Sequence, residues 1–344
     1  MRRGHAPVEK SIDDLVTNRP EWNWHGEVPI QFSPYFDWPP RPWKILKSIA
    51  GRGFVISQNL IYVVLAFLTW FYLAPPMSQW VTFQAGWIAH LFLLNLALIT
   101  FTAGALHLYL RTFKKQGNQR KFDFREIKKR DPRFFVNNQV WDNMFYTCVS
   151  GVTVWTFFQA IVMWAYANQL APWLNFNEHP VWFVLMFLLL PMWGSLHFYV
   201  IHRLLHWPPL YKLAHALHHR NVDPNPWSGL SMHPLEHVLY LSFVFIHLLI
   251  PTHPIHMFFL AYTKLLAAIT SHCGYEDVLV NGKRTIEFGE FFHQIHHRYF
   301  DCNYGTLVMP WDKWFGSFHD GTVNATAKVR AAQRAKRGGH RNVC

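Results

Sequence analysis

The chain has 344 residues, of which 51% are hydrophobic and only 15% are charged, whereas soluble domains carry about 25% charged residues. This composition excludes an ordinary soluble domain and indicates a surface that largely faces lipid. The net charge of +12 fits nucleic acid or an anionic membrane face. Because the basic residues flank apolar stretches and form no aromatic-studded groove, nucleic acid is not expected as a partner.

The first predicted segment, residues 1–53, is polar and rich in proline and tryptophan. We expect a cytoplasmic N-terminal arm, which is either an irregular surface loop or a segment whose aromatic rings rest on the membrane interface. No early apolar run follows the initial Met-Arg-Arg, so the sequence shows no cleavable signal peptide. A membrane domain is expected over residues 54–320, followed by a basic cytoplasmic tail over 321–344.

Four apolar stretches come next, and each is long enough to cross a bilayer as a helix, which needs about 20 residues. They cover residues 54–74, 83–110, 143–167 and 181–201. A fifth apolar region, residues 238–271, is interrupted by two prolines, and each arm is shorter than the membrane core of about 30 Å. The sequence therefore predicts an all-α integral membrane fold with about four transmembrane helices, a deep helical hairpin and a cytoplasmic helical cap.

The distribution of Lys and Arg gives the orientation of these helices. The connector at residues 111–142 is rich in Lys and Arg, whereas the connectors at 75–82 and 168–180 hold none. By the positive-inside rule, the N-terminus and the 111–142 connector lie in the cytoplasm. Four crossings and one hairpin then bring residues 202–297 to the same cytoplasmic face.

Histidine is the unusual residue of this chain, with 22 copies, while the four cysteines form no Cys-x-x-Cys pair. The first motif has two histidines four residues apart, and two later motifs share the pattern His-x-x-His-His. On a helix of 3.6 residues per turn, these spacings keep the rings of each motif on one face. The eight histidines of the three motifs are His202, His206, His215, His218, His219, His293, His296 and His297.

Imidazole rings in this number point to metal. Imidazole suits iron, zinc, copper and nickel. With His272 the set offers nine rings, which is too many for one ion and enough for two neighbouring ions. Histidines clustered in or beside a membrane are costly unless they serve a site. The remaining histidines that lie in the spans, in the outer connector or near the hairpin tip are predicted to be structural or interfacial: His90, His107, His179, His247, His253 and His256.

These motifs resemble those of the fatty acid hydroxylase and sterol desaturase superfamily of membrane di-iron enzymes. The resemblance covers roughly residues 140–320 and includes His233–Glu236, His272–Tyr275, Asn303–Gly305 and Trp311–Gly316. The loop at Trp227–Pro234 is more similar to the sterol desaturase branch.

The resemblance implies a set of site residues. Some family members carry a further histidine four residues before the one that matches His272, and here that position is Ala268, so His233, His237 or a water molecule could complete the set. Carboxylates are expected around the ligands, since an all-histidine site needs acceptors for the outer ring nitrogens. The candidates are Glu236, Asp223, Glu276, Asp277, Asp301 and Asp312. The implied metal ligands are the eight motif histidines with His233, His237 and His272, and the implied catalytic residues are Glu236, Asn303 and Tyr304.

The resemblance also implies an activity, cofactors and partners. Two iron ions, or zinc after misloading, would use O₂ to remove hydrogen from an unactivated C–H bond of a membrane lipid, giving an alcohol or an alkene. An electron-donor protein is implied, either a cytochrome b-type protein or a ferredoxin with its reductase. The basic connector and tail could dock an acidic donor, or could reflect topology alone. The expected membrane is the endoplasmic reticulum in a eukaryote and the inner membrane in a bacterium.

Other classes remain open at this point. A metal transporter, or a metal-binding membrane protein without oxygenase activity, would place its ligands near the middle of the membrane on broken helices. A membrane cytochrome would pair histidines such as His90 and His107 on different spans. For an oxygenase, we expect the substrate to reach the metals through a gap between the fourth span and the hairpin. Its expected lining residues are Leu196, Val200, Leu241, Phe245 and Leu265.

Overall fold

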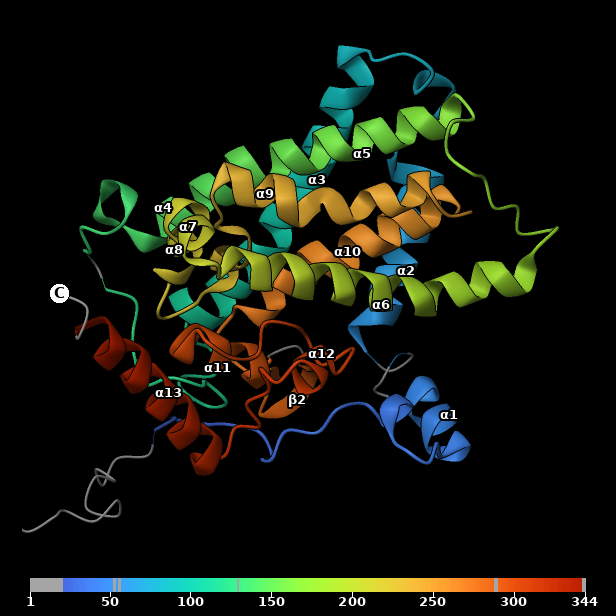
Figure 1. Cartoon of the computed structure of the whole chain (residues 1–344). Helices are drawn as coiled ribbons and strands as arrows, with labels where there is room; N and C mark the ends of the chain where they lie inside the picture. The colour runs from blue at the N-terminus through green and yellow to red at the C-terminus, as the bar shows by residue number, and fades with distance from the viewer. Residues whose placement is uncertain (1–20, 52–53, 55–56, 129, 288–289, 342–344) are drawn as a thin grey trace, which may run out of the picture.

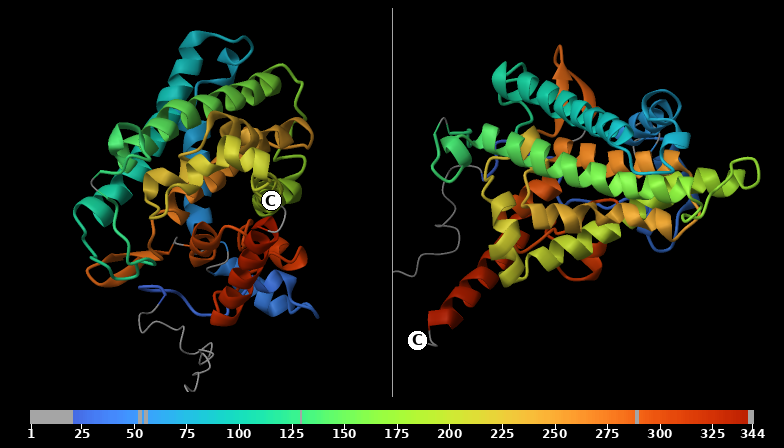
Figure 2. Two further views of the ribbon diagram at one scale, coloured as in Figure 1. Left: turned by 60° about the vertical axis from the view of Figure 1, so that its left-hand side comes forward. Right: turned by 90° about the horizontal axis from the view of Figure 1, so that it is seen from above.

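The computed structural model describes residues 21–51, 54, 57–128, 130–287 and 290–341, and side chains up to residue 335. Nearly all regular structure in these ranges is helical, and the long helices run side by side (Figure 1). The shorter C-terminal helices gather below and at one end of this bundle, so a helical layer and a cap can be distinguished in Figure 1 and in the left view of Figure 2. The first 20 residues of the predicted arm lie outside the described part.

Among the described residues, three helices are long and apolar enough to cross a membrane. The first is α3 (Ala85–His107), which continues through a π-helical turn to Thr112. The second runs without a break from α4 (Gln139–Phe145) through a π-helical turn (Tyr146–Gly151) into α5 (Val152–Ala167). The third is α6 (Pro180–Leu205), which begins with a proline at its first position, where no backbone donor is needed.

The first predicted span is shorter than the sequence suggested. Helix α2 (Gln58–Leu68) starts at Ser57, whose side chain accepts a hydrogen bond from the Asn59 amide, and it continues as a π-helix only to Leu73. Ala74 is extended because it precedes Pro75, and a residue before proline is disfavoured in the helical region. The apolar helix therefore falls below the length of a full span, and three rather than four helices reach that length in the described residues.

The predicted helical hairpin is present. It consists of α9 (Pro234–Leu241), which tightens into a 3₁₀-helix (Ser242–Leu248), and of α10 (Pro254–Ser271). The turn between them contacts the connector after α5, since the Thr252 amide donates to the Pro172 carbonyl. Helix α10 is buried along nearly its whole length, which makes it the centre of the hydrophobic core.

The cap contains short helices and one small sheet. Its helices are α7 (Pro208–Leu210), a π-helical turn (Tyr211–His215), α8 (Ala216–His219), a 3₁₀-helix (Pro226–Leu230), α11 (Phe291–Tyr299), α12 (Trp311–Trp314) and α13 (Val323–Arg341). The sheet pairs β1 (Asp277–Val280) with β2 (Lys283–Glu287), so the prediction of an all-α fold needs this correction. Asn281 and Gly282 both have positive φ, the geometry of a tight hairpin turn.

The described part of the N-terminal arm packs against the cap. Trp22 is buried and its ring meets that of Phe291 edge-on at 5.0 Å, while the Asn23 amide donates to the Phe122 carbonyl. The following segment holds a 3₁₀ turn (Pro34–Phe36) and α1 (Pro42–Ala50). Trp38 and Trp43 are 91% and 74% exposed. The described part of the arm is thus packed against the cap at Trp22 and exposes aromatic rings at Trp38 and Trp43.

Candidate metal centre

Four segments bring the predicted histidines together at the junction of bundle and cap. The last turn of α6 carries His202 and ends at His206, and Pro208 and Pro209 then redirect the chain into the second motif. The C-terminus of α10 supplies His272, and α11 supplies the third motif. Residues that are far apart in the sequence therefore meet because α6 and α10 end on the same side of the bundle.

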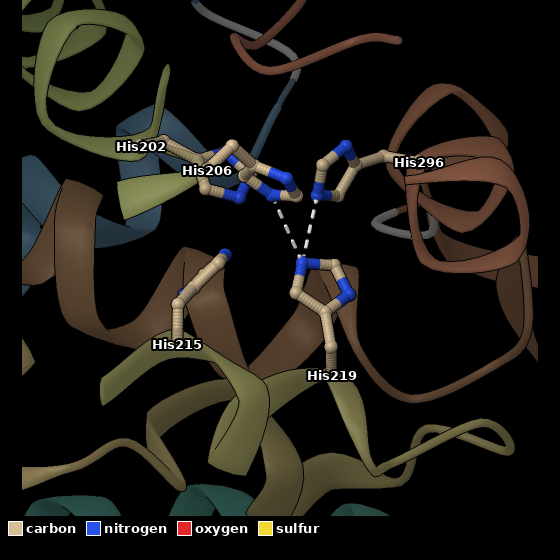
Figure 3. A group of neighbouring side chains, drawn as sticks. All are labelled: His202, His206, His215, His219 and His296. Atoms are coloured by element: carbon tan, nitrogen blue, oxygen red, sulfur yellow. Dashed lines mark hydrogen bonds between the residues drawn. The ribbon is translucent and has the colours of Figure 1, made fainter. Parts of the chain in front are cut away.

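Five of these histidines form the first group. One nitrogen atom from each ring lies within 4.8 Å of the corresponding atoms of the other rings (Figure 3). His219 Nε2 lies 3.1 Å from both His206 Nε2 and His296 Nε2. The five members are His202, His206, His215, His219 and His296.

The other four histidines form the second group, which is buried throughout. His272 Nε2 lies 3.0 Å from the Nε2 atoms of His293 and His297, and 3.2 Å from that of His218. Neighbouring rings connect the groups, since the centroids of His219 and His297 are 4.9 Å apart. The two groups are therefore adjacent, and together they contain nine of the eleven histidines that the sequence suggested as ligands.

The outer nitrogens of several rings are already hydrogen-bonded to backbone carbonyls. Nδ1 of His202 donates to the Tyr304 carbonyl at 2.6 Å, and Nδ1 of His296 donates to the Cys302 carbonyl at 2.6 Å. Nδ1 of His272 donates in the same way to the Ala268 carbonyl at 2.7 Å. A carbonyl can only accept, so each Nδ1 carries the proton and each neutral ring presents an Nε2 lone pair to the centre.

This arrangement fits a cation. Lone pairs of neutral imidazoles that face one another at about 3 Å repel each other unless a positive ion lies between them. Nitrogen ligands at about 2.0–2.1 Å from a metal are themselves separated by roughly 3 Å, as the geometry of a coordination shell requires. His215 Nε2 is also buried and has no hydrogen-bond partner among the described residues, as expected for a metal-binding atom. The two groups could therefore each bind a metal ion.

Burial keeps the rings in the form that binds metal. Desolvation lowers the pKa of His206 to about 2, that of His215 to about 3 and that of His218 to about 4, with nearby histidines adding to the effect at His206. The cause is the free-energy cost of a charged ring away from water. These rings are neutral at physiological pH, and a neutral imidazole is the ligand form.

Among the predicted carboxylates, Glu236 contacts a histidine of the first group directly. Its Oε1 atom lies 2.7 Å from His215 Nδ1, so it fixes the tautomer of that ring in the way that outer-shell carboxylates do at metal sites. Its other oxygen is buried without a hydrogen-bond partner among the described residues. Burial raises the pKa of this carboxyl to about 7.

Asn303 and Tyr304 form a loop beside the first group. Asn303 has a positive φ of 54°, and its amide group donates to the Phe292 and His319 carbonyls, which fixes the turn after α11. The ring of Tyr304 lies 4.9 Å from that of His206. Asp312 accepts hydrogen bonds from the Tyr304 and Gly305 amides and so holds the carbonyl that orients His202. Sequence reasoning missed these carbonyl acceptors, because every residue has one.

The remaining predicted residues lie outside both groups. His233 Nδ1 accepts from the Leu235 amide at the start of α9, and both ring nitrogens of His237 are engaged, with Ser150 and with the Leu230 carbonyl. Asp223 pairs with Arg111, and Asp277 pairs with Arg120 and Arg284. His319, which lies outside the histidine motifs, is also buried, and its ring contacts the Gly321 amide and the Thr326 hydroxyl.

A cavity of about 830 Å³ leads to the centre. It is lined by α6 and α10, as expected, and also by the start of α2 and by β2. The side chains of His202 and His215 from the first group and of His218, His272 and His293 from the second reach it.

The five residues expected to line this gap do not do so. Leu241 and Leu265 are buried in the core, and Val200 is 51% exposed on the outside of α6. The lining positions of α6 include Pro191, Ser195 and Phe198, a helix face next to the one that was chosen.

Comparison with known proteins finds similarities that cover the same region. Residues 183–317 match the fatty acid hydroxylase family model. The chain is 28% identical over 138 residues to a Delta(7)-sterol 5(6)-desaturase of Gibberella zeae, which covers 40% of this chain and 42% of that protein. It is 32% identical over 149 residues to methylsterol monooxygenase 1 of Gallus gallus, covering 42% and 50%.

A third relative is the Delta(7)-sterol 5(6)-desaturase of Saccharomyces cerevisiae, at 31% identity over 124 residues, 35% of this chain and 32% of that protein. The chain thus spans half or less of the length of these curated relatives. No solved structure matches it.

Proposed function

We propose that the chain is a membrane oxygenase that hydroxylates or desaturates a lipid at two histidine-bound iron ions. The proposal is supported by the match of residues 183–317 to the fatty acid hydroxylase family model and by the similarity to sterol desaturases and a methylsterol monooxygenase. The observation that carries the proposal is the convergence of Nε2 atoms in two adjacent, buried groups. The lipid class follows from the sterol substrates in the relatives' names and from the apolar helices that border the cavity.

The proposed ligands are the nine histidines of the two groups, five for one ion and four for the other. His233 and His237 are assigned to the surrounding structure, because neither belongs to the two groups, Nδ1 of His233 accepts from the Leu235 amide, and both ring nitrogens of His237 have partners elsewhere. A water molecule is the remaining candidate for the position that Ala268 leaves without a ring. The iron pair would supply O₂ activation and hydrogen removal from an unactivated C–H bond.

The protein contributes orientation and a water-poor surrounding. Glu236 holds His215 and adds a negative charge beside a cationic centre, and the loop braced by Asp312 holds His202. In this assignment, Glu236 and the Asn303–Tyr304 loop are positioning residues, since Glu236 contacts Nδ1 of His215 and the Tyr304 carbonyl accepts from Nδ1 of His202. The cavity brings a lipid chain to both groups at once.

The proposed topology keeps the centre on the cytoplasmic side. Helices α3, α4–α5 and α6 cross the membrane, and the shorter α2 with its π-helical end provides the fourth crossing that a cytoplasmic arm requires, while the hairpin packs against these helices. The basic 111–142 connector, the arm before residue 54 and the tail after residue 320 would then be cytoplasmic. The basic connector and tail would receive an acidic electron-donor protein. Cysteine labelling at residue 125 tests this topology, and labelling from outside the cell contradicts it.

The test of activity is a comparison of lipid extracts. Cells with the chain, supplied with ¹⁸O₂, should contain a lipid with one added ¹⁸O atom or one added double bond, and cells that express a His296→Ala variant should lack it. Purified active protein should contain two iron ions per chain, with zinc as the misloaded substitute. Unchanged lipids at full iron loading, with a matching electron donor present, contradict the proposal. The relatives give no support to a transporter, which would bind metal without any change in lipids.

A further inference from the structure

A lysine side chain lies inside the cavity that reaches the two histidine groups. Lys264 occupies the middle of the apolar helix α10, lines the cavity and is only 8% exposed. An amine in such surroundings costs free energy unless something compensates its lost hydration. Ionisable residues in apolar membrane segments therefore usually serve a function.

The protein satisfies this amine only in part. Lys264 Nζ donates to the Gly194 carbonyl of α6 at 3.1 Å. It also lies 4.5 Å from the ring centroid of Phe198 and 5.4 Å from that of Tyr240, so two aromatic faces stabilise its charge. Glu290 lines the same cavity, and it forms no ion pair with Lys264 among the described residues. An ammonium group has three donors, and one of them has a protein acceptor among the described residues.

The packing of α6 against α10 leaves room for this side chain. A Cβ atom at position 194 would lie 3.0 Å from Lys264 Cδ and 3.3 Å from a methyl group of Leu260. Glycine at this position therefore lets the lysine stem pass between the two helices. The next residue, Ser195, lines the cavity and its hydroxyl lies 3.1 Å from that of Thr306, so this wall of the cavity carries several polar groups.

A single aromatic ring separates the amine from the proposed metal ligands. The Phe198 ring stacks on that of His202 with centroids 4.9 Å apart, and lies 6.3 Å from that of His293. These two histidines belong to different groups. A molecule that binds Lys264 would therefore extend from the amine toward both groups, along a cavity whose other lining includes Ile201 and Met232.

We propose that Lys264 binds an oxygen atom of the substrate, and that the substrate is a lipid with a hydroxyl or carboxylate group at the end of a hydrocarbon body. The assignment rests on the proposed function, because it takes the cavity to be the substrate site. An oxygen acceptor would satisfy the donors that the protein leaves without an acceptor. A hydrocarbon without that oxygen would remove water from the amine and offer nothing in return. Sites built to bind a substrate hydroxyl reject the analogue that lacks it, by factors that can reach about 10⁴.

The experiment measures binding of two probe pairs to the full chain in detergent. One pair is cholest-7-en-3β-ol and cholest-7-ene, and the other is octadecanoic acid and octadecane. The wild type should bind the oxygenated member of one pair at least about 10-fold more tightly than its hydrocarbon. The pair that shows this preference identifies the oxygen as a sterol hydroxyl or an acyl carboxylate. In Lys264→Met, which keeps an unbranched stem, the preference should fall to about threefold or less.

Two controls keep the result interpretable. Thr263→Val changes a neighbouring cavity residue whose hydroxyl already donates to the Leu260 carbonyl, and it should keep the wild-type preference. Lys264→Gln replaces the Met variant if that variant is recovered without metal, and the same loss of preference is expected. If the wild type binds the oxygenated probe and its hydrocarbon equally tightly in both pairs, the assignment is overturned. It is also overturned if the Lys264→Met or Lys264→Gln variant keeps the wild-type preference. The binding assay needs no turnover, so its result is independent of the lipid assay. If the protein oxygenates a lipid but shows no preference for the oxygenated probes, only the role of Lys264 is rejected. If it shows the preference but oxygenates no lipid, only the proposed function is rejected.

Discussion

The chain buries histidines in two regions, and the regions differ in where the ring nitrogens lie. At the junction with the cap, the Nε2 atoms of nine rings converge on one another. At the hairpin tip, His256 Nε2 donates to the Phe183 carbonyl, His253 Nδ1 accepts from the Ile255 amide, and His247 Nδ1 bonds to Thr252. Nitrogens paired with the backbone or a hydroxyl hold a turn together, whereas nitrogens that face each other require an ion.

The same contrast explains why histidine count and burial alone do not identify a metal site. Rings in both regions are buried. In the cap, backbone carbonyls occupy Nδ1 and leave Nε2 free to bind metal, as with His202 and His296. At the tip, His253 and His256 form the capping box of α10, so their function is to satisfy the first backbone amides of that helix.

The largest effect is expected from removing a ring of either group. His296→Ala and His272→Ala should each lower the metal content from two ions to about one per chain, and turnover should fall at least about 100-fold, since even outer-shell changes can cost that much. Elemental analysis and a turnover assay measure both. The matched control is His319→Ala, a buried cap histidine outside both groups, which should keep two ions. If His319→Ala loses as much metal as the other two variants, the assignment of the metal ions to the two histidine groups is contradicted.

A smaller loss is expected when the charge beside His215 is removed. Glu236→Gln keeps an acceptor for His215 Nδ1 but deletes the negative charge, and it should lower metal affinity about 10- to 100-fold. Competition with a chelator measures this affinity. Asp277→Asn, a buried carboxylate that pairs with Arg120 and Arg284 away from the centre, should leave it unchanged. An unaltered affinity in the Glu236 variant would show that this carboxylate has no part in the centre.

The metal-free protein should lose stability in acid. Burial lowers the pKa of His215 to about 3 and that of His218 to about 4, below the ordinary value of 6.5. Below pH 6.5, the unfolded chain therefore binds more protons at these two histidines than the folded chain does. The contribution of the two buried neutral rings to stability is complete above pH 6.5 and declines as the pH falls toward 4. Burial raises the pKa of Glu236 and of Glu290 to about 7, which acts in the opposite direction but involves fewer groups. The melting temperature in detergent should fall between pH 7 and pH 5, and a constant or rising value contradicts this balance.

The smallest effect on metal is expected at the hairpin tip. His256→Ala removes the hydrogen bond to Phe183 and should cost about 1–3 kcal/mol of stability, while metal content stays at two ions per chain. Thermal unfolding and elemental analysis on the same sample separate these results. Loss of an ion from this variant would contradict a purely structural role for the histidines at the hairpin tip.

The sequence predicted which histidines lie together better than it predicted their surroundings. Helical spacing selected the eight histidines of the three motifs, because the pattern of each motif places its rings on one face, whereas His272 lies outside these motifs. It could not show that the Tyr304, Cys302 and Ala268 carbonyls orient these rings, because acceptors on the backbone leave no mark in the sequence. The His-x-x-His-His pattern therefore specifies a cluster but not its hydrogen-bonded shell.

Three features of the fold differ from prediction for local reasons. The helix after residue 57 ends early because prolines follow at positions 75 and 76. The β-hairpin is not predicted although Asn281-Gly282 is a strong turn signal, because its two strands have only four and five residues and lie between helical segments. The cavity lining was assigned to a neighbouring face of α6, because an apolar helix gives no polar stripe from which its inward side can be recognised.

The presence of two metal ions is tested most directly by an anomalous scattering map of the iron-loaded protein. Two peaks are expected, one within bonding distance of Nε2 atoms from the first group and the other among those of the second group. The first group is His202, His206, His215, His219 and His296, and the second is His218, His272, His293 and His297. No peak is expected near His247, His253 or His256. A single peak, or a peak bound through the hairpin tip, would contradict the central claim that two adjacent histidine groups each hold one metal ion.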